Sequence, residues 1–90
     1  MNKTEIARAF LTRKPGACHN AKTDGTAYKL HGSTIARHTE TGSIEFSFCG
    51  FYTTTTASHI NEILKAAGAS RRVSYAQARD GKQPVTFTMF

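Results

Sequence analysis

Residues 42–68, with the sequence GSIEFSFCGFYTTTTASHINEILKAAG, contain the change of hydrophobic period that decides the fold. From Ile44 to Phe48 every second side chain is apolar, which is the period of a strand with one buried face. After a run of four threonines, apolar residues recur at i, i+3, i+4 and i+7 from Ile60 to Ala67, which is the period of a helix. The sequence therefore predicts a strand and then a helix over about residues 57–67.

The chain before this stretch begins with a predicted helix. Asn2 and Glu5 have the three-residue spacing of a capping box, and apolar residues follow at helical spacing, so we expect a helix over residues 3–13. Pro15 ends this helix, because the residue before a proline disfavours helical geometry. Residues 17–25 are mostly polar and predict a loop.

Three further segments alternate like strands. Residues 28–37 alternate on both sides of His31-Gly32, a pair that suits a tight turn, so we expect a β-hairpin there. Residues 72–75 and 84–89 alternate in the same way, and Asp80-Gly81 between them predicts a second hairpin. The predicted order is helix, three strands, helix, two strands.

This order predicts an α+β fold in a single domain over residues 1–90. Consecutive antiparallel strands would form one sheet of about five strands, with both amphipathic helices packed on one face of it. The other face of the sheet would then meet solvent or a partner.

The charge of the chain favours an anionic partner. Twelve Lys and Arg residues against six Asp and Glu residues give a net charge of +6. Nucleic acid, an acidic protein surface and an anionic membrane surface are the classes of partner that such a charge attracts. No apolar run approaches the roughly 20 residues that span a bilayer, so an integral membrane protein is excluded.

The first residues lack the apolar segment of a secretory signal peptide, which predicts a cytoplasmic protein. In that setting we expect Cys18 and Cys49 to be reduced thiols, and one disulfide between them is the alternative.

Cysteine and histidine side chains are the residue types that bind zinc, but their spacing here argues against a metal site. The pairs and short knuckles of zinc sites are absent from the sequence, and no nucleophile-elbow pattern accompanies the thiols. We therefore expect no metal, no cofactor and no enzymatic activity. The residues considered for these roles are Cys18, His19, His31, His38, Cys49 and His59.

The threonine run, Thr53 to Thr56, has two interpretations. Its hydroxyl groups can cap the second helix, or they can hold a phosphate at the positive end of that helix. The run lacks the glycine-lysine pattern of a phosphate-binding loop, and we expect capping.

Basic residues interleaved with aromatic ones give the clearest indication of a binding surface. If these side chains converge, they could bind the phosphates of a nucleic acid and stack on its unpaired bases. A solvated surface, with the aromatic side chains covering the core, is the alternative. The predicted binding residues are Lys29, Arg37, Phe51, Tyr52, Arg71 and Arg72.

One pattern resembles a family of small bacteriophage proteins. It consists of residues 30–37 (LHGSTIAR), 42–44 (GSI), 49–56 (CGFYTTTT) and Ile60-Asn61. Members of that family have a Gly-x-x-Ile-Ala strand, a glycine turn, a strand ending in Gly-aromatic, a Thr-rich helix start and an Asn inside the helix. The match covers about residues 26–64.

The resemblance implies a phage origin, an accessory role in infection and a place in the cytoplasm of the infected host cell. It assigns no catalytic residue. Ser58 and His59 stand where the family pattern has a basic residue, which weakens any argument that the second helix itself contacts nucleic acid.

Two hypotheses for function follow. The first is a nucleic-acid-binding protein that uses a basic and aromatic face of the sheet. The second is a phage-encoded inhibitor that binds a host enzyme or host defence complex, with an acidic host protein as the partner. A homodimer through the apolar C-terminal strand, residues 85–90, is a further expectation.

Overall fold

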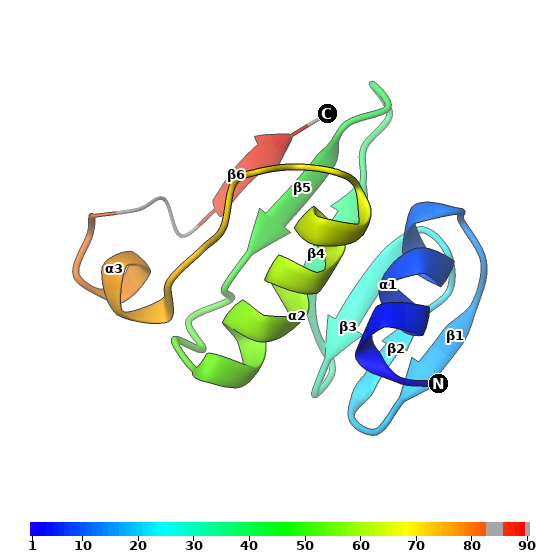
Figure 1. The fold of residues 1–90 in the computed structure, drawn as a ribbon, viewed down its shortest axis with the longest axis horizontal. Helices are drawn as coiled ribbons and strands as arrows, with labels where there is room; N and C mark the ends of the chain where they lie inside the picture. The colour runs from blue at the N-terminus through cyan, green and yellow to red at the C-terminus, as the bar shows by residue number, and fades with distance from the viewer. Residues whose placement is uncertain (83–85, 90) are drawn as a thin grey trace.

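The computed structural model describes residues 1–82 and 86–89 of the 90-residue chain. In these residues six strands form one antiparallel sheet in the order β1-β2-β3-β4-β5-β6, and helices pack on it (Figure 1). Along the chain the elements are α1 (Lys3–Leu11), β1 (Gly16–Cys18), β2 (Ala21–Thr23), β3 (Ala27–Leu30), β4 (Ser33–His38), β5 (Ile44–Ser47), α2 (Thr54–Ala66), α3 (Tyr75–Arg79) and β6 (Thr86–Met89).

The N-terminal helix, α1, starts with the predicted capping box. The backbone N–H of Glu5 donates to the Asn2 side chain over 2.8 Å, and the Glu5 carboxylate accepts from the Asn2 N–H over 3.0 Å. Ile6 and Phe10 are fully buried on the sheet side of the helix. The helix ends at Leu11, two residues before the predicted end, and Arg13 takes a left-handed φ of 60°.

The prediction of a loop over residues 17–25 is wrong, because this segment contains β1 and β2. The two strands form a hairpin in which Cys18 pairs with Ala21 around a two-residue turn. Their buried side chains are Cys18, Ala21 and Thr23, none of them large. A strand that buries only small or polar side chains has no hydrophobic alternation to detect.

The predicted hairpin over residues 28–37 is confirmed as β3 and β4. Its turn residues His31 and Gly32 have φ angles of 51° and 82°, the left-handed pair that a two-residue hairpin turn requires. Tyr28 is buried and Lys29 is exposed, as the alternation predicts. The predicted strand after Gly42 is also confirmed, as β5.

The second long helix, α2, begins three residues earlier than predicted. Thr53 is its N-cap, and the Thr53 hydroxyl accepts from the backbone N–H of Thr56 over 3.2 Å. The threonine run therefore caps the helix and forms its first turn. Ile60, Ile63 and Leu64 are fully buried, which confirms the predicted apolar face.

The prediction of a strand over residues 72–75 is wrong. The backbone of Val73 pairs with a side chain and not with a strand: the amide group of Asn61 donates to the Val73 carbonyl over 3.0 Å and accepts from the Val73 N–H over 2.7 Å. The chain then forms α3, which ends at Arg79 with Asp80 as its C-cap, so Asp80-Gly81 is not a hairpin turn.

The last strand, β6, pairs antiparallel with β5 and lies at the edge of the sheet. Its described part is Thr86–Met89, within the predicted strand, whereas Pro84, Val85 and Phe90 lie outside the described residues. The sheet has six strands rather than about five, and an additional short helix stands in place of a predicted strand.

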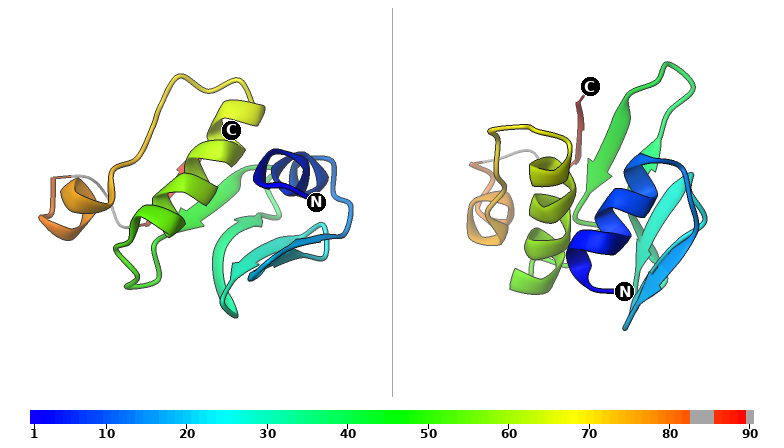
Figure 2. Two further views of the ribbon diagram at one scale, coloured as in Figure 1. Left: turned by 60° about the horizontal axis from the view of Figure 1, so that its bottom comes forward. Right: turned by 45° about the vertical axis from the view of Figure 1, so that its right-hand side comes forward.

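The predicted fold class is confirmed, because α1 and α2 lie side by side on one face of an antiparallel sheet (Figure 2). The core between the layers is formed by aromatic and aliphatic side chains that include Phe10, Tyr28, Phe46 and Leu64. No helix in the described part of the chain is both long and apolar enough to cross a membrane.

Candidate functional site

The six predicted binding residues lie in three separate places. Lys29 in β3 and Arg37 in β4 alternate with buried neighbours and therefore project from the sheet face opposite α1 and α2. Phe51 and Tyr52 lie in the connection between β5 and α2. The structure does not bring these residues together with the arginines that follow α2.

Those arginines, Arg71 and Arg72, contact their own chain. The Arg71 guanidinium lies 4.1 Å from the centre of the Phe87 ring, which belongs to the helix-covered face. Nη1 of Arg72 donates to the carbonyls of Ala69 and Arg71 over 2.6 and 2.7 Å. Both side chains thus stabilise the segment after α2, and binding of a partner by them stays a prediction.

The two adjacent aromatic residues differ in exposure. Phe51 is 53% exposed, whereas Tyr52 is partly buried and stacks on the core residue Phe48 with ring centres 6.0 Å apart. Phe51 alone of this pair is presented to solvent as a large apolar side chain. The aromatic side chains of the described strands, Tyr28, Phe46 and Phe87, all face the core.

The open face, which we define as the sheet face opposite α1 and α2, carries one close pair of like charges. Lys22 of β2 and Lys29 of β3 are directly opposite each other in the antiparallel register, and both are exposed. No ion pair in the described part of the chain joins either lysine to a carboxylate. Like charges at directly opposite positions destabilise a sheet.

A carboxylate does lie near this pair, but it is bound to the backbone. Asp24, which follows β2, accepts from the N–H groups of Thr26 and Ala27 over 2.8 and 2.9 Å. These two hydrogen bonds, with a smaller contribution from the charge of Lys29, hold the pKa of Asp24 below its usual range. The carboxylate therefore stays ionised and fixes the β2–β3 turn.

The other half of the open face, over β4, β5 and β6, is close to neutral. Arg37 is opposite Glu45, and its Nε donates to the Glu45 carboxylate over 2.9 Å. Hydroxyl side chains surround this pair, and Thr86 donates to Ser47 over 3.3 Å. A shallow hollow of about 320 Å³ lies among these residues.

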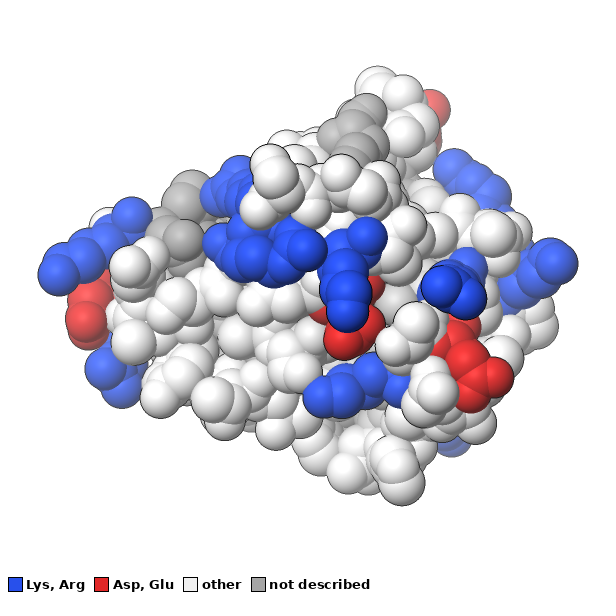
Figure 3. Space-filling view, viewed as in Figure 1, with Lys and Arg blue, Asp and Glu red and all other residues white. Residues whose placement is uncertain are grey.

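The helix-covered side shows no single basic surface. In Figure 3, which views the molecule from that side, the Lys and Arg side chains are spread over several separate places, and some lie next to Asp or Glu.

Lys22 lies on the open face but is not among the predicted binding residues, because the sequence predicted a loop for its segment. With β2 recognised as a strand, its alternation with Ala21 and Thr23 would have placed it there.

Thiols and imidazoles do not form a metal centre in the residues that the structure describes. No group of three or more His, Cys, Asp and Glu side chains there is arranged to hold a metal ion. Cys18 is buried and Cys49 is exposed, and both are free thiols.

Comparison with protein families finds a match that covers most of the chain. The sequence model described as Kyanoviridae Gp96 protein matches residues 4–84. The chain belongs to the Kyanoviridae Gp96 family. Since Gp96 is a phage protein family, the predicted membership of a phage protein family is confirmed. The match to Gp96 begins in α1 and extends beyond α3. No curated protein and no solved structure matches the chain.

Proposed function

We propose that this Gp96 family member is a phage accessory protein that binds nucleic acid in the cytoplasm of the infected host cell, without catalysing a reaction. The binding surface is the half of the open face that carries Lys22 and Lys29. The observation that supports the proposal is the register of these two lysines, which face each other across β2 and β3.

This arrangement of the two lysines is electrostatically unfavourable in the free protein. Two ammonium groups on opposite strand positions repel each other, and directly opposite Cβ atoms are only about 4.5–5.5 Å apart. A phosphate group between them would replace this repulsion by two attractions and would release counterions from the nucleic acid. The flexible side chain of lysine suits such a contact, because it acts as a mobile point charge.

The net charge of +6 supports the same class of partner over a longer range. A positive protein attracts a polyanion during diffusion, and this attraction weakens as salt is added. Because contacts to phosphates carry no direct information about the bases, binding through these lysines should depend little on base sequence.

Fluorescence anisotropy with labelled single-stranded and double-stranded oligonucleotides tests the proposal. We expect binding at low salt, and we expect the double variant Lys22→Gln/Lys29→Gln to lose about tenfold or more in affinity, since each phosphate contact contributes strongly at low salt. The matched control is Lys65→Gln/Lys82→Gln, which removes the same charge outside the open face. Failure of the natural protein to bind at low salt, or an equal loss in both variants, would overturn the proposal.

A second candidate function is inhibition of a host enzyme or defence complex by direct binding. The neutral half of the open face favours it, because Glu45 neutralises Arg37 and the surrounding groups are hydroxyls. Such a surface offers hydrogen bonds to a protein but little attraction to phosphates. A nuclease-treated pull-down from host lysate separates the two functions, since a protein partner survives nuclease and a nucleic-acid bridge does not.

We also propose that the protein forms a homodimer through β6. In the described residues β6 pairs with β5 on one side and has no strand on the other, and such an edge can pair with a second chain. Sedimentation at high micromolar concentration should then show a dimer, and a monomer at every concentration would contradict it.

A further inference from the structure

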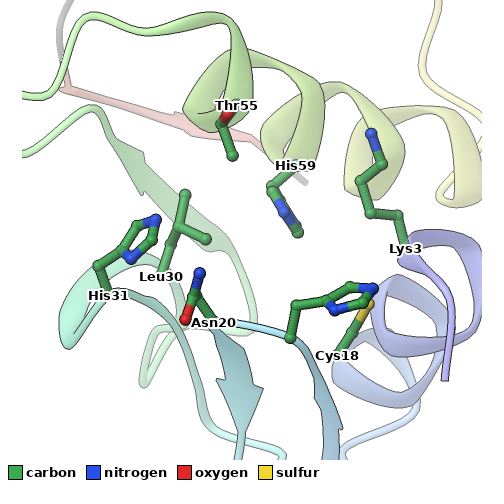
Figure 4. A pocket seen from close by; sticks show the side chains of 8 residues that line it. Lys3, Cys18, Asn20, Leu30, His31, Thr55 and His59 are labelled. Atoms are coloured by element: carbon green, nitrogen blue, oxygen red, sulfur yellow. The ribbon is translucent and has the colours of Figure 1, made fainter.

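A cleft separate from the open face lies where the turns of the two N-terminal hairpins approach α1 and α2. It has a volume of about 220 Å³, and side chains from four places in the chain line it (Figure 4). Lys3 comes from α1, Thr55 and His59 come from α2, and His19 and His31 come from the hairpin turns. In the described residues, none of the side chains that line it is acidic.

His59 has one ring nitrogen fixed inside the core and the other free for a ligand. The residue is only 6% exposed, and its Nδ1 lies 2.5 Å from the hydroxyl of Tyr28. No hydrogen bond joins Nε2 to another group in the described part of the chain, and Figure 4 shows the ring pointing into the cleft.

The partner of His59 decides which nitrogen carries the ring proton. Tyr28 is fully buried, and this burial raises the pKa of its hydroxyl well above the usual range, so the hydroxyl keeps its proton. Nδ1 is the acceptor that this hydroxyl has, so the proton of a neutral imidazole lies on Nε2. His59 therefore presents an N–H donor to the cleft.

Burial also keeps His59 neutral. Its pKa lies below the ordinary value, mainly because burial disfavours the charged ring and also because Lys3 and His31 are nearby. The ammonium group of Lys3 donates to the Ser58 hydroxyl over 2.7 Å, which positions it at the cleft and leaves further N–H groups for a ligand. Lys3 and His59 thus supply one charged donor and one neutral donor, and the methyl group of exposed Thr55 points into the cleft (Figure 4).

An apolar hollow continues the cleft on one side. It has a volume of about 270 Å³ and shares Leu30, His31 and Thr55 with the first cavity. Ile35 and Phe51 complete its apolar wall, and Phe51 is 53% exposed. A donor-rich half therefore adjoins an aromatic half, which matches a ligand that has an anionic end and a flat apolar end.

We propose that this cleft binds a phosphorylated nucleoside, with the phosphoryl group between Lys3 and His59 and the base against Phe51. Hydrogen bonds from charged and neutral donors suit phosphate oxygens, and bases stack on exposed aromatic rings. A free nucleotide and the phosphorylated end of a nucleic-acid strand share this chemistry. The site is independent of the open face.

Amide chemical shifts in a ¹⁵N-labelled sample test the site. Titration with adenosine 5′-monophosphate should shift the amides of Lys3, His31, Thr55 and His59, and adenosine without phosphate should bind about tenfold more weakly, the value of one charge-assisted contact. An oligonucleotide with a 5′-phosphate, compared with one that ends in a hydroxyl, distinguishes the strand end from the free nucleotide as the source. Binding of either phosphorylated probe at these amides supports the proposal, and no shift there with both overturns it.

Two variants separate the halves of the cleft. Lys3→Gln should weaken binding of the monophosphate about tenfold, whereas Lys14→Gln, the same charge change three residues beyond the C-terminal end of α1, should leave it nearly unchanged. Phe51→Ala should reduce the affinity for the monophosphate to that for inorganic phosphate. Equal affinities of Lys3→Gln and Lys14→Gln would contradict the assignment.

Titration with the monophosphate also distinguishes this site from the open face. Lys22→Gln/Lys29→Gln should bind the monophosphate as the natural protein does, so the cleft proposal can hold where the open-face proposal fails. Loss of monophosphate binding in this double variant would show that the open face holds the phosphate and would overturn the cleft.

Discussion

The two faces of the sheet differ in burial and charge, so that a buried aromatic residue and an exposed charged residue are neighbours in the same strand. In β3, Tyr28 is fully buried and meets the Phe10 ring edge-on at 5.9 Å, whereas the next residue, Lys29, is exposed and faces another lysine. In β5, Phe46 is fully buried and Glu45 forms an ion pair on the open face. Because burial of apolar area dominates stability, the sheet face covered by α1 and α2 stabilises the fold, and the open face contributes less to it.

The largest expected effect separates the two faces within β5. Phe46→Ala removes a ring stacked on Phe87 and should lower the free energy of unfolding by about 3–5 kcal/mol. Glu45→Ala, one residue away, breaks an exposed ion pair and should cost about 0–1 kcal/mol. Urea unfolding followed by circular dichroism measures both. Similar losses in the two variants would contradict the division between the faces.

A second variant tests how the segment after α2 is held on the covered face. Asn61→Ala removes both hydrogen bonds to the Val73 backbone and should cost about 1–3 kcal/mol, because the peptide groups lose their partner. It should also speed tryptic cleavage after Arg71 and Arg72. Lys65→Ala, an exposed position of the same helix, is the control. An unchanged cleavage rate in Asn61→Ala would show that another contact holds the segment.

The buried histidine of the covered side should make stability depend on pH. Because the pKa of His59 in the folded chain lies below its ordinary value, the unfolded chain binds more protons near that value. Stability should therefore fall as the pH drops from about 7 to about 5, around the ordinary histidine pKa. His59→Gln, measured by thermal unfolding, should weaken this dependence. The same pH dependence in both proteins would contradict it.

The smallest expected effect has the opposite sign. Lys22→Gln removes the repulsion across β2 and β3 and should raise the free energy of unfolding by about 0.2–1 kcal/mol. Lys65→Gln, an isolated exposed change on α2, should leave stability nearly unchanged. A loss of stability in Lys22→Gln would mean that Lys22 stabilises the fold. The repulsion between Lys22 and Lys29 would then no longer support a phosphate-binding role.

The parts of the fold that sequence predicts well are those with large apolar side chains at a regular spacing. Phe46 and Ile44 identify β5, and Ile60, Ile63 and Leu64 identify α2. The β1–β2 hairpin escapes prediction because it buries only small or polar side chains. The residues around Val73 alternate like a strand, but a side chain twelve residues back in the sequence, Asn61, supplies the hydrogen bonds, and alternation alone does not reveal this partner.

The positions of the candidate residues follow only in part from the sequence. Alternation placed Lys29 on the face opposite Tyr28, where the structure has it together with Arg37. It missed Lys22, whose segment has no visible period, and it grouped Arg71 with these residues although its guanidinium covers Phe87 on the other face. The aromatic half of the predicted face does not form, because exposed Phe51 lies in a connection and not in a strand.

The central claim is that Lys22 and Lys29 bind nucleic acid through its phosphates. The most direct measurement is the slope of log affinity against log salt concentration for a DNA duplex, compared between the natural protein and Lys22→Gln/Lys29→Gln. The two lysines share one phosphate, and each phosphate neutralised contributes about 0.9 to this slope, so the account predicts a slope shallower by about 0.9 in the double variant. Equal slopes in the two proteins would contradict the claim.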